Sequence, residues 1–276
     1  MDKKKLVSIV IPVFNEQENL VRTYKQVKAI MDQVGHKYDY EFVFTDNHST
    51  DDTYAEAEKV AKGDQSVRVF RFSRNFGFQR SIATGYAKAK GDAAIQIDCD
   101  LQDPPELILE FLKAWEQGYK VVYGIRRSRQ EGFFITRTRR LFYRLIDSLS
   151  EDTLPHDAGD FRLVDRCVLD ELTKIYDYQP YLRGTIASLG FNQKGIPYDR
   201  RERRYGQSKF PFSELMKLAL DGILNHSVLP LRVATICGLL ISVATIFGLV
   251  GYIIGKLFYF IYLIVYKCNC TRIPRC

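Results

Sequence analysis

Short apolar runs alternate with longer segments of mixed character along the first 125 residues. Each run is rich in β-branched or aromatic residues, which predicts a strand covered on both faces. The runs lie at 6–13, 41–45, 67–72, 93–97 and 121–123. Between them, apolar residues recur at helical spacing, at 16–34, 51–62, 78–90 and 104–117. Strands that alternate with helices in this way predict an α/β domain whose mostly parallel sheet is flanked by helices.

Two of the predicted strands are followed by a carboxylate. Asp46 follows the run at 41–45, and Asp98 follows the run at 93–97. Ligands of parallel sheets bind beyond the carboxyl ends of the strands. We therefore expect a binding site at this edge of the sheet, with both side chains in it.

Arginines crowd the stretch after residue 125 and are interleaved with apolar residues near 133–149. This pattern predicts a basic amphipathic helix that lies on a membrane surface with anionic headgroups. An ordinary helix with a solvated basic face is the alternative. A second amphipathic stretch, at 210–228, leads directly into an apolar region, which favours the interfacial interpretation.

The apolar region at 229–266 contains only two charged residues, Arg232 and Lys256. One full membrane span is predicted at about 230–255, because this length crosses a bilayer core of about 30 Å. The apolar residues that follow cover about half a bilayer, so the second span is predicted to be incomplete. The basic tail at 267–276 is atypical.

The composition excludes few classes of function. Lys and Arg number 40 against 33 Asp and Glu, a net charge of +7, which suits phosphate-bearing ligands and anionic membranes equally. The six cysteines lack the spacing of a disulfide framework or a zinc site, which indicates reduced thiols. We expect a catalytic domain at 1–209 with no secretory signal, since no small-residue cleavage site follows the charged N-terminus.

The sequence IDCDLQD places two carboxylates, Asp98 and Asp100, on either side of one residue at the end of a buried strand. Mg²⁺ and Mn²⁺ prefer oxygen ligands and take few from protein when substrate phosphates supply others. An ion held there would stabilise charge on a departing nucleoside diphosphate. Such a motif alone often marks a solvated turn, but its place after a strand favours metal binding.

Two further segments suit a nucleotide ligand. In TDNHSTDDT, the Asp46 carboxylate can accept hydrogen bonds from a base or ribose, although an acidic helix N-terminus is the alternative. The segment RRERRYGQSK at 200–209 suits a loop that grips phosphates or a basic juxtamembrane segment. No glycine-rich phosphate loop of the P-loop or dinucleotide type occurs.

Six segments, in this order and spacing, carry a resemblance to a known family: IVIPVFNEQENL, FTDNHSTDDT, FSRNFGFQRSIATGYAKAKGD, IQIDCDLQDPPE, DAGDFRL and RRERRYGQSKF. Together they resemble glycosyltransferase family 2. Within it, they are similar to the polyprenyl-phosphate glycosyltransferases, such as dolichyl-phosphate mannosyltransferases and bactoprenol glucosyltransferases. The resemblance implies a GT-A fold with its active site on the cytoplasmic face of the inner membrane.

The resemblance also implies roles for individual residues. It assigns the nucleotide pocket to Pro12, Asn15, Glu16 and Asp46, and it adds Arg74 to the substrate-binding set. It assigns the metal and diphosphate positions to Asp98, Asp100 and Gln102. The basic loop that meets the donor diphosphate and the acceptor phosphate matches Arg200, Arg203, Ser208 and Lys209. Asp160 and Arg162 match positions beside the acceptor and complete the catalytic set with Asp98 and Asp100. Asn47 stands where the family commonly has a second carboxylate.

The implied reaction transfers a hexose to a polyprenyl phosphate, such as undecaprenyl phosphate, with Mg²⁺ or Mn²⁺ and inversion. UDP-glucose is the favoured donor and GDP-mannose the alternative. Donor, lipid acceptor and membrane lipid are the expected partners, nucleic acid is not, and homo-oligomerisation stays open. A lipid phosphate is mostly ionised near neutral pH, because its second pKa is about 6, so it needs no strong base. We therefore assign Asp160 an orienting role.

Three other functions fit part of the pattern. A haloacid-type phosphatase also has D-x-D after a strand, but it would need Thr or Val where Leu101 stands. A processive polysaccharide synthase would need a Q-x-x-R-W signature, which the sequence lacks. An inactive, membrane-tethered relative that binds a nucleotide-sugar is the non-enzymatic alternative.

Overall fold

The computed structural model describes residues 4–127, 158–175, 177, 180–200 and 229–270. The chain divides into two compact units, Met1–Phe212 and Ser213–Cys276. The helices predicted near 133–149 and at 210–228 lie outside the described residues, as do Arg203, Ser208 and Lys209. The interpretation of these segments therefore stays a prediction.

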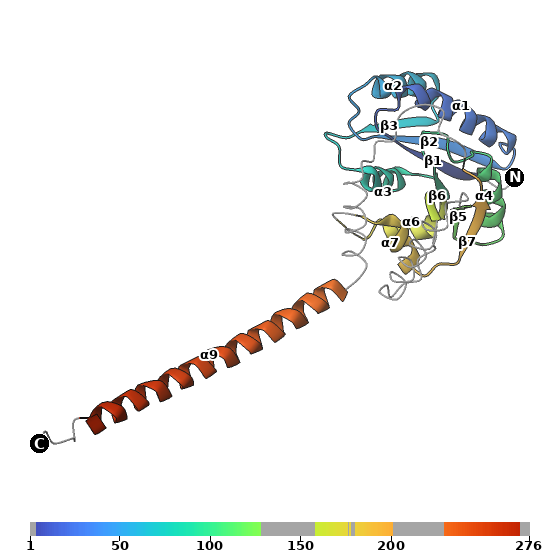
Figure 1. The fold of residues 1–276 in the computed structure, drawn as a ribbon. Helices are drawn as coiled ribbons and strands as arrows, with labels where there is room; N and C mark the ends of the chain where they lie inside the picture. The colour runs from blue at the N-terminus through green and yellow to red at the C-terminus, as the bar shows by residue number, and fades with distance from the viewer. Residues whose placement is uncertain (1–3, 128–157, 176, 178–179, 201–228, 271–276) are drawn as a thin grey trace, which may run out of the picture. The chain divides into compact units, whose positions relative to one another are not determined.

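The first unit contains a seven-stranded sheet with the strand order β3-β2-β1-β4-β6-β5-β7 (Figure 1). The strands are β1 (Lys5–Val13), β2 (Tyr38–Asp46), β3 (Val67–Arg71), β4 (Ala93–Gln96), β5 (Val121–Arg126), β6 (Ala158–Asp165) and β7 (Gln193–Tyr198). Only β6 runs antiparallel, between β4 and β5, and the other strands of this sheet are parallel to one another. Their carboxyl ends therefore form one edge of the sheet.

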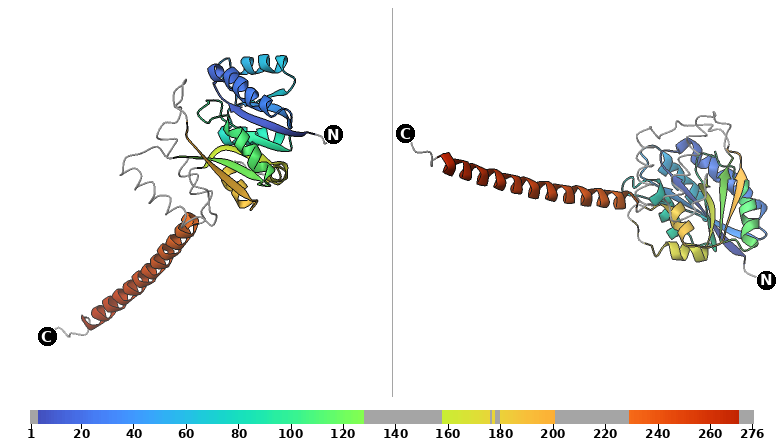
Figure 2. Two further views of the ribbon diagram at one scale, coloured as in Figure 1. Left: turned by 90° about the vertical axis from the view of Figure 1, so that its right-hand side faces the viewer. Right: turned by 60° about the horizontal axis from the view of Figure 1, so that its bottom comes forward.

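Helices cover both faces of this sheet, as Figures 1 and 2 show. One layer consists of α1 (Gln17–Gln33), α2 (Thr53–Gly63) and α4 (Leu107–Glu116), which bury residues such as Leu20 and Phe111 in one core. The other consists of α3 (Phe78–Lys88), α6 (Arg166–Leu172) and α7 (Leu182–Ser188), which bury residues such as Ile82 and Ile186 in a second core.

Strand β1 shows why the sequence pattern was continuous. Ile9 belongs to the first core and Val10 to the second, and both are fully buried. Successive strand residues point to opposite faces, so a strand covered on both sides needs apolar residues at every position. Gly85 brings α3 close to this strand, because a Cβ there would lie 2.2 Å from Val10 Cγ1.

The α/β class predicted from the sequence is confirmed, and all five predicted strands and four predicted helices are present. The sequence analysis did not predict β6, β7, α6 or α7. The helices α6 and α7 have seven residues each, too few for a clear helical period.

The second unit contains one long helix, α9 (Leu229–Cys270). Its segment Val233–Ile264 is long and apolar enough to cross a membrane, by length and composition. The helix continues through residues 255–257, where the sequence pattern had suggested the end of one span and the start of another incomplete one. No proline interrupts this stretch, so nothing in the backbone chemistry forces a break.

Candidate functional site

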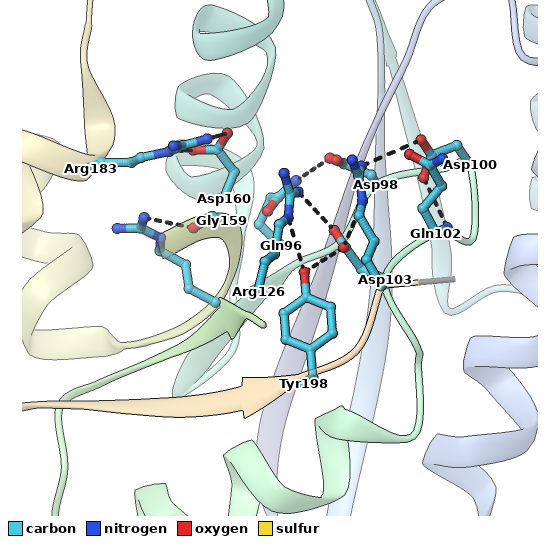
Figure 3. A network of polar contacts seen from close by, with 12 residues as sticks. Gln96, Asp98, Asp100, Gln102, Asp103, Arg126, Gly159, Asp160, Arg183 and Tyr198 are labelled. Carbon is cyan, nitrogen blue, oxygen red and sulfur yellow. Dashed lines mark hydrogen bonds and ion pairs between the residues drawn. The ribbon is translucent and has the colours of Figure 1, made fainter. Parts of the chain in front are cut away.

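The D-x-D loop begins directly after β4, at the carboxyl edge of the sheet (Figure 3). Gln96 Nε2 donates a hydrogen bond to Asp98 Oδ1 at 2.8 Å. The backbone nitrogen of Gln102 donates to Asp100 Oδ1 at 3.1 Å. Leu101 lies between them with a φ of 55°, a left-handed conformation that turns the loop sharply. These contacts fix two carboxylates at the end of a buried strand, as the sequence predicted.

The electrostatics of this loop are unbalanced. Burial raises the pKa of Asp98 to about 7, and the negative charges of Asp103, Asp100 and Asp160 contribute to this rise, against the hydrogen bond from Gln96. A carboxyl group with this pKa is in an environment that disfavours its charge. The loop therefore has an excess of negative charge that a bound cation would neutralise.

Asp103, three residues beyond Asp100, is surrounded by cations and a hydrogen-bond donor instead of by other carboxylates. Its side chain is fully buried and accepts a hydrogen bond from the Tyr198 hydroxyl of β7. Arg126 of β5 approaches it to 3.4 Å, and so does Arg200, which also lies 3.9 Å from Asp100. The structure thus brings the predicted Arg200 to the D-x-D loop. Sequence analysis missed Asp103, Arg126 and Tyr198, although Asp103 belongs to the quoted IDCDLQD motif.

Asp160 and Arg162 lie on β6, which pairs directly with β4 so that Arg162 is opposite Gln96. Asp160 is 8% exposed and receives two hydrogen bonds from Arg183 of α7, at 2.8 and 2.7 Å. Gln79 of α3 adds a longer hydrogen bond at 3.4 Å. Burial alone would raise the pKa of Asp160, but the hydrogen bonds and charge of Arg183 outweigh it and hold the pKa below its ordinary value.

Arg162 is a buried cation beside this carboxylate. It is 4% exposed, and its Nη2 donates to the carbonyl of Gly159 at 3.0 Å. Burial lowers the pKa of Arg162 from its usual range. The Tyr86 hydroxyl has Arg162 and Asp160 as charged neighbours and, within the described residues, no hydrogen-bond partner. A buried guanidinium next to an unsatisfied hydroxyl is suited to receiving an anion.

The residues predicted to bind the nucleotide lie at and just beyond the ends of β1 and β2. Pro12 pairs with Thr45, one residue before Asp46. Asn15 accepts a hydrogen bond from the backbone of Thr50 at 2.8 Å. The backbone nitrogen of Glu16 donates to Thr53 at 2.7 Å. Hydrogen bonds thus tie the loop after β1 to the loop after β2, and the predicted residues are neighbours.

Asp46 itself is fully buried at the end of β2. Its Oδ1 accepts a hydrogen bond from the backbone of Ser49 at 3.0 Å. Its Oδ2 lies 3.4 Å from Arg71 Nε and, among the described residues, has no hydrogen-bond partner. The alternative interpretation, an acidic helix N-terminus, applies to Asp51, which accepts from the backbone of Thr53. One oxygen of Asp46 thus lacks a hydrogen bond among the described residues, and its role in nucleotide binding stays a prediction.

Asn47 has a structural task that the sequence did not reveal. Its side chain donates to Asn75 at 2.8 Å and accepts from the backbone of Phe76 at 2.8 Å. It thereby anchors the loop between β3 and α3. Arg74 lies on this loop, exposed, with its guanidinium 4.2 Å from the centre of the Phe76 ring. The structure thus places Arg74 against an aromatic ring of its own loop, and its role in substrate binding stays a prediction.

The donor set fits a hard divalent cation. Within the described residues, no three or more His, Cys, Asp and Glu side chains are grouped as a metal site. Mg²⁺ commonly takes only one or two protein carboxylates and completes its shell with substrate phosphates and water. Asp98 and Asp100 supply such a pair, and the raised pKa of Asp98 marks a place where positive charge is missing.

Comparison with known proteins gives consistent matches. A family model described as Glycosyl transferase family 2 matches residues 8–173. The uncharacterized glycosyltransferase YkcC of Bacillus subtilis (strain 168) is 42% identical over 236 residues, which are 85% of this chain and 72% of that protein. The bactoprenol glucosyl transferase of Shigella phage SfV is 35% identical over 244 residues, 88% of this chain and 79% of that protein.

Two solved structures share the fold. The mannosyltransferase PcManGT from Pyrobaculum calidifontis, solved with GDP-Man and Mn²⁺, has a TM-score of 0.53 at 17% identity, over 75% of this chain and 59% of that chain. The glucosyl-3-phosphoglycerate synthase from Mycobacterium tuberculosis, solved with Mn²⁺ and UDP, has a TM-score of 0.51 at 20% identity, over 77% of this chain and 74% of that one. At these identities the likeness establishes the fold alone.

Proposed function

The chain belongs to glycosyltransferase family 2 and is a glycosyltransferase with a GT-A fold, and we propose that it transfers glucose from UDP-glucose to a polyprenyl phosphate. The relatives named bactoprenol glucosyl transferases support this choice, because they align over 88% of the chain. Transfer of mannose from GDP-mannose is the second candidate. The structure of PcManGT with GDP-Man favours it less, since its identity to this chain is low.

One observation carries the proposal: an acidic loop and a cationic cluster lie on paired strands. The D-x-D loop follows β4, and Asp160 with Arg162 lies on β6 directly beside it. The D-x-D loop is suited to a donor diphosphate with its cation, and the cluster on β6 is suited to the acceptor phosphate. A reaction between two anions needs this arrangement, because their repulsion must be neutralised while they are aligned.

The chemistry follows from the charges. An oxygen of the lipid phosphate, mostly ionised near neutral pH, attacks the anomeric carbon of the sugar. The bond from that carbon to the nucleoside diphosphate breaks, and the diphosphate leaves with the bonding electrons. Attack from the opposite side inverts the anomeric configuration. No proton has to be removed from the nucleophile, so the site needs no general base.

Asp160 therefore acts as an orienting residue in this proposal. Arg183 holds it as a carboxylate through two hydrogen bonds, and a carboxylate with a lowered pKa is a poor base. Its charge balances Arg183 and keeps both side chains next to Arg162. Arg162 and Arg183 then face the incoming phosphate as fixed cations.

On the donor side, Asp98 and Asp100, with Gln102 beside them, would hold Mg²⁺ or Mn²⁺, which supplies positive charge for the departing diphosphate. Asp46 accepts hydrogen bonds from the base or ribose through its buried carboxylate. Arg200, with Arg203, Ser208 and Lys209 further along the basic loop, contacts the diphosphate and the acceptor phosphate.

The location proposed for this reaction is the cytoplasmic face of the inner membrane. The helix α9 could anchor the chain there, given the length and composition of Val233–Ile264. A polyprenyl phosphate is itself confined to the bilayer by its apolar chain, so an anchored enzyme meets it at the interface.

The test is transfer from radiolabelled UDP-glucose to undecaprenyl phosphate by the detergent-purified full chain, with Mn²⁺ and with a chelator. We expect labelled lipid only with Mn²⁺. Label from GDP-mannose alone would replace the first donor by the second. Donor binding without lipid labelling or hydrolysis, for every donor tried, would point to the inactive relative.

A second comparison separates the roles of the two carboxylates. Asp98→Asn should abolish transfer, whereas Asp160→Asn should retain a measurable part of it, because an asparagine can still accept one hydrogen bond from Arg183. The reverse ranking would assign Asp160 to the proton transfer that the proposal excludes.

A further inference from the structure

Large hydrophobic side chains of the first unit are exposed around helix α3. Among its described residues they are Phe76, Phe78 and Ile175, which are 39%, 39% and 46% exposed. Ile175 is about a hundred residues away in sequence, but Arg80 of α3 donates to the carbonyl of Asp177 at 3.3 Å. Ile175 and Arg80 line the same shallow cavity of about 220 Å³ beside α3. We call Phe76, Phe78 and Ile175 the α3 rim.

The structure holds this surface in place. Asn47 fixes the backbone of Phe76, and the Asn75 side chain accepts a hydrogen bond from the backbone of Gly77 at 2.8 Å. Gly77 has a φ of 92°, a conformation that glycine adopts without strain. The ring of Phe76 also packs edge-on against Phe72. Phe76 and Phe78 thus expose apolar surface on an anchored segment, and exposed apolar surface of this kind marks a candidate contact site.

The charge around the rim indicates what that partner is. Between residues 65 and 91 there are six Lys and Arg and no Asp or Glu. Arg68 and Arg71 are ion-paired with Glu41 and Asp46, and the segment with these two partners is still positive. Arg74 stacks on Phe76 at 4.2 Å. Exposed Phe rings among arginines match a bilayer interface with anionic headgroups, where Phe enters the headgroup boundary and Lys or Arg meets the headgroups.

We propose that the α3 rim contacts the surface of an anionic phospholipid bilayer and brings the acceptor side of the site to the lipid headgroups. Gln79, the residue after Phe78, connects the α3 rim to the acceptor side of the site. Its side chain donates a hydrogen bond to Asp160 and accepts one from the backbone of Leu182. The purpose of this contact rests on the proposed function, because a lipid phosphate must reach Asp160 and Arg162. The contact itself rests on the exposed rings and on the charge.

The experiment introduces a fluorescent reporter, Phe76→Trp, into the full chain reconstituted in nanodiscs that contain anionic lipid with brominated acyl chains. The native background is one tryptophan, Trp115, which is 6% exposed. The control is Tyr119→Trp. Tyr119 also has a cation over its ring, Lys194, but it precedes β5 and lies at the opposite edge of the sheet.

We expect the bromines to quench the emission that Phe76→Trp adds by roughly half or more, since interfacial side chains reach about 5–10 Å into the headgroup boundary. The Tyr119→Trp protein should be quenched no more than the unaltered chain. Equal quenching of the Phe76→Trp protein and the control would overturn the proposal. So would emission from the Phe76→Trp protein that depends on protein concentration but not on lipid, which would assign the rim to a second copy of the chain.

A measurement of sugar transfer accompanies the quenching experiment. The double variant Phe76→Ser, Phe78→Ser should keep transfer to a short-chain, detergent-soluble isoprenyl phosphate within about twofold. Its rate of transfer to undecaprenyl phosphate in vesicles should fall roughly tenfold, because only that acceptor requires membrane contact. Equal loss with both acceptors would contradict the proposal. If the unaltered chain glycosylates neither acceptor, the proposed function fails, while the quenching result still decides the membrane contact.

Discussion

Replacing Asp98 with Asn should stabilise the metal-free protein at pH 8 while it abolishes sugar transfer. The reason is the surroundings of the carboxyl group: it is partly buried, it accepts a hydrogen bond from Gln96, and three other carboxylates contribute to its raised pKa. Asparagine has nearly the same shape, can still accept from Gln96, and carries no charge. The substitution therefore removes a cost of folding and a ligand of the proposed cation together.

The size and sign of this stabilisation follow from the linkage between proton binding and folding. The pKa of Asp98 is about 7 in the folded protein against an ordinary value of 3.8. At pH 8 this difference corresponds to about 4 kcal/mol of unfavourable ionisation. Because the folded pKa is the higher one, the cost is absent below the unfolded pKa, grows as the pH rises from about 4 to about 7, and is complete above that range. At pH 5 it is about 2 kcal/mol.

Thermal unfolding in detergent with a chelator measures this effect. Asp98→Asn should raise the Tm by roughly 8 to 16 °C at pH 8, since 1 kcal/mol shifts a unit of this size by about 2 to 4 °C, and by less than half as much at pH 5. The matched control is Asp103→Asn, which should lower the Tm, because it removes the buried negative charge that pairs with Arg126 and Arg200. A Tm for Asp98→Asn at or below that of the unaltered chain at pH 8 would refute the reasoning.

Three further predictions concern other parts of the first unit. Arg183→Ala should lower kcat by about tenfold or more and move the acidic limb of the pH–rate profile upward, because the pKa of Asp160 rises without its partner; Arg183→Lys should restore part of both. Asp46→Asn should raise the donor Kd by about tenfold, or roughly 1.4 kcal/mol, without changing the Kd of the lipid acceptor, measured by titration of each. Gly91→Ala should cost about 2 kcal/mol or more, read as a lower Tm, because its Cβ would lie 2.7 Å from the backbone oxygen of Leu6.

The sequence predicted the strands that are buried on both faces and did not predict β6 and β7. The difference is chemical. β6 has Asp160 and Arg162 at buried positions, so its sequence resembles a binding motif more than a strand. β7 contains Gly195 and Pro197 within six residues, a composition tolerated because β7 is an edge strand. Strands that build the site, or that close the sheet, therefore deviate from the apolar pattern that identifies strands in the core.

Asp98 and Asp160 could be selected from the sequence, but their charge states and the role of Asp103 could not. Asp98, Asp103 and Asp160 all fall in motifs, and nothing local distinguishes them. Their partners are far away along the chain: Tyr198 is 95 residues from Asp103, and Arg183 is 23 residues from Asp160.

Only the fold decides which carboxylate has a cation beside it. Asp103 has Arg126 and Arg200, and Asp160 has Arg183. Asp98 is the carboxyl group whose pKa is raised to about 7, by burial first and then by the charges of its acidic neighbours. A protein gains nothing in stability from such a group, so its place is explained by what it binds. Of the three carboxylates, Asp98 is therefore the position where we expect the proposed cation to bind, and its substitution tests the site most directly.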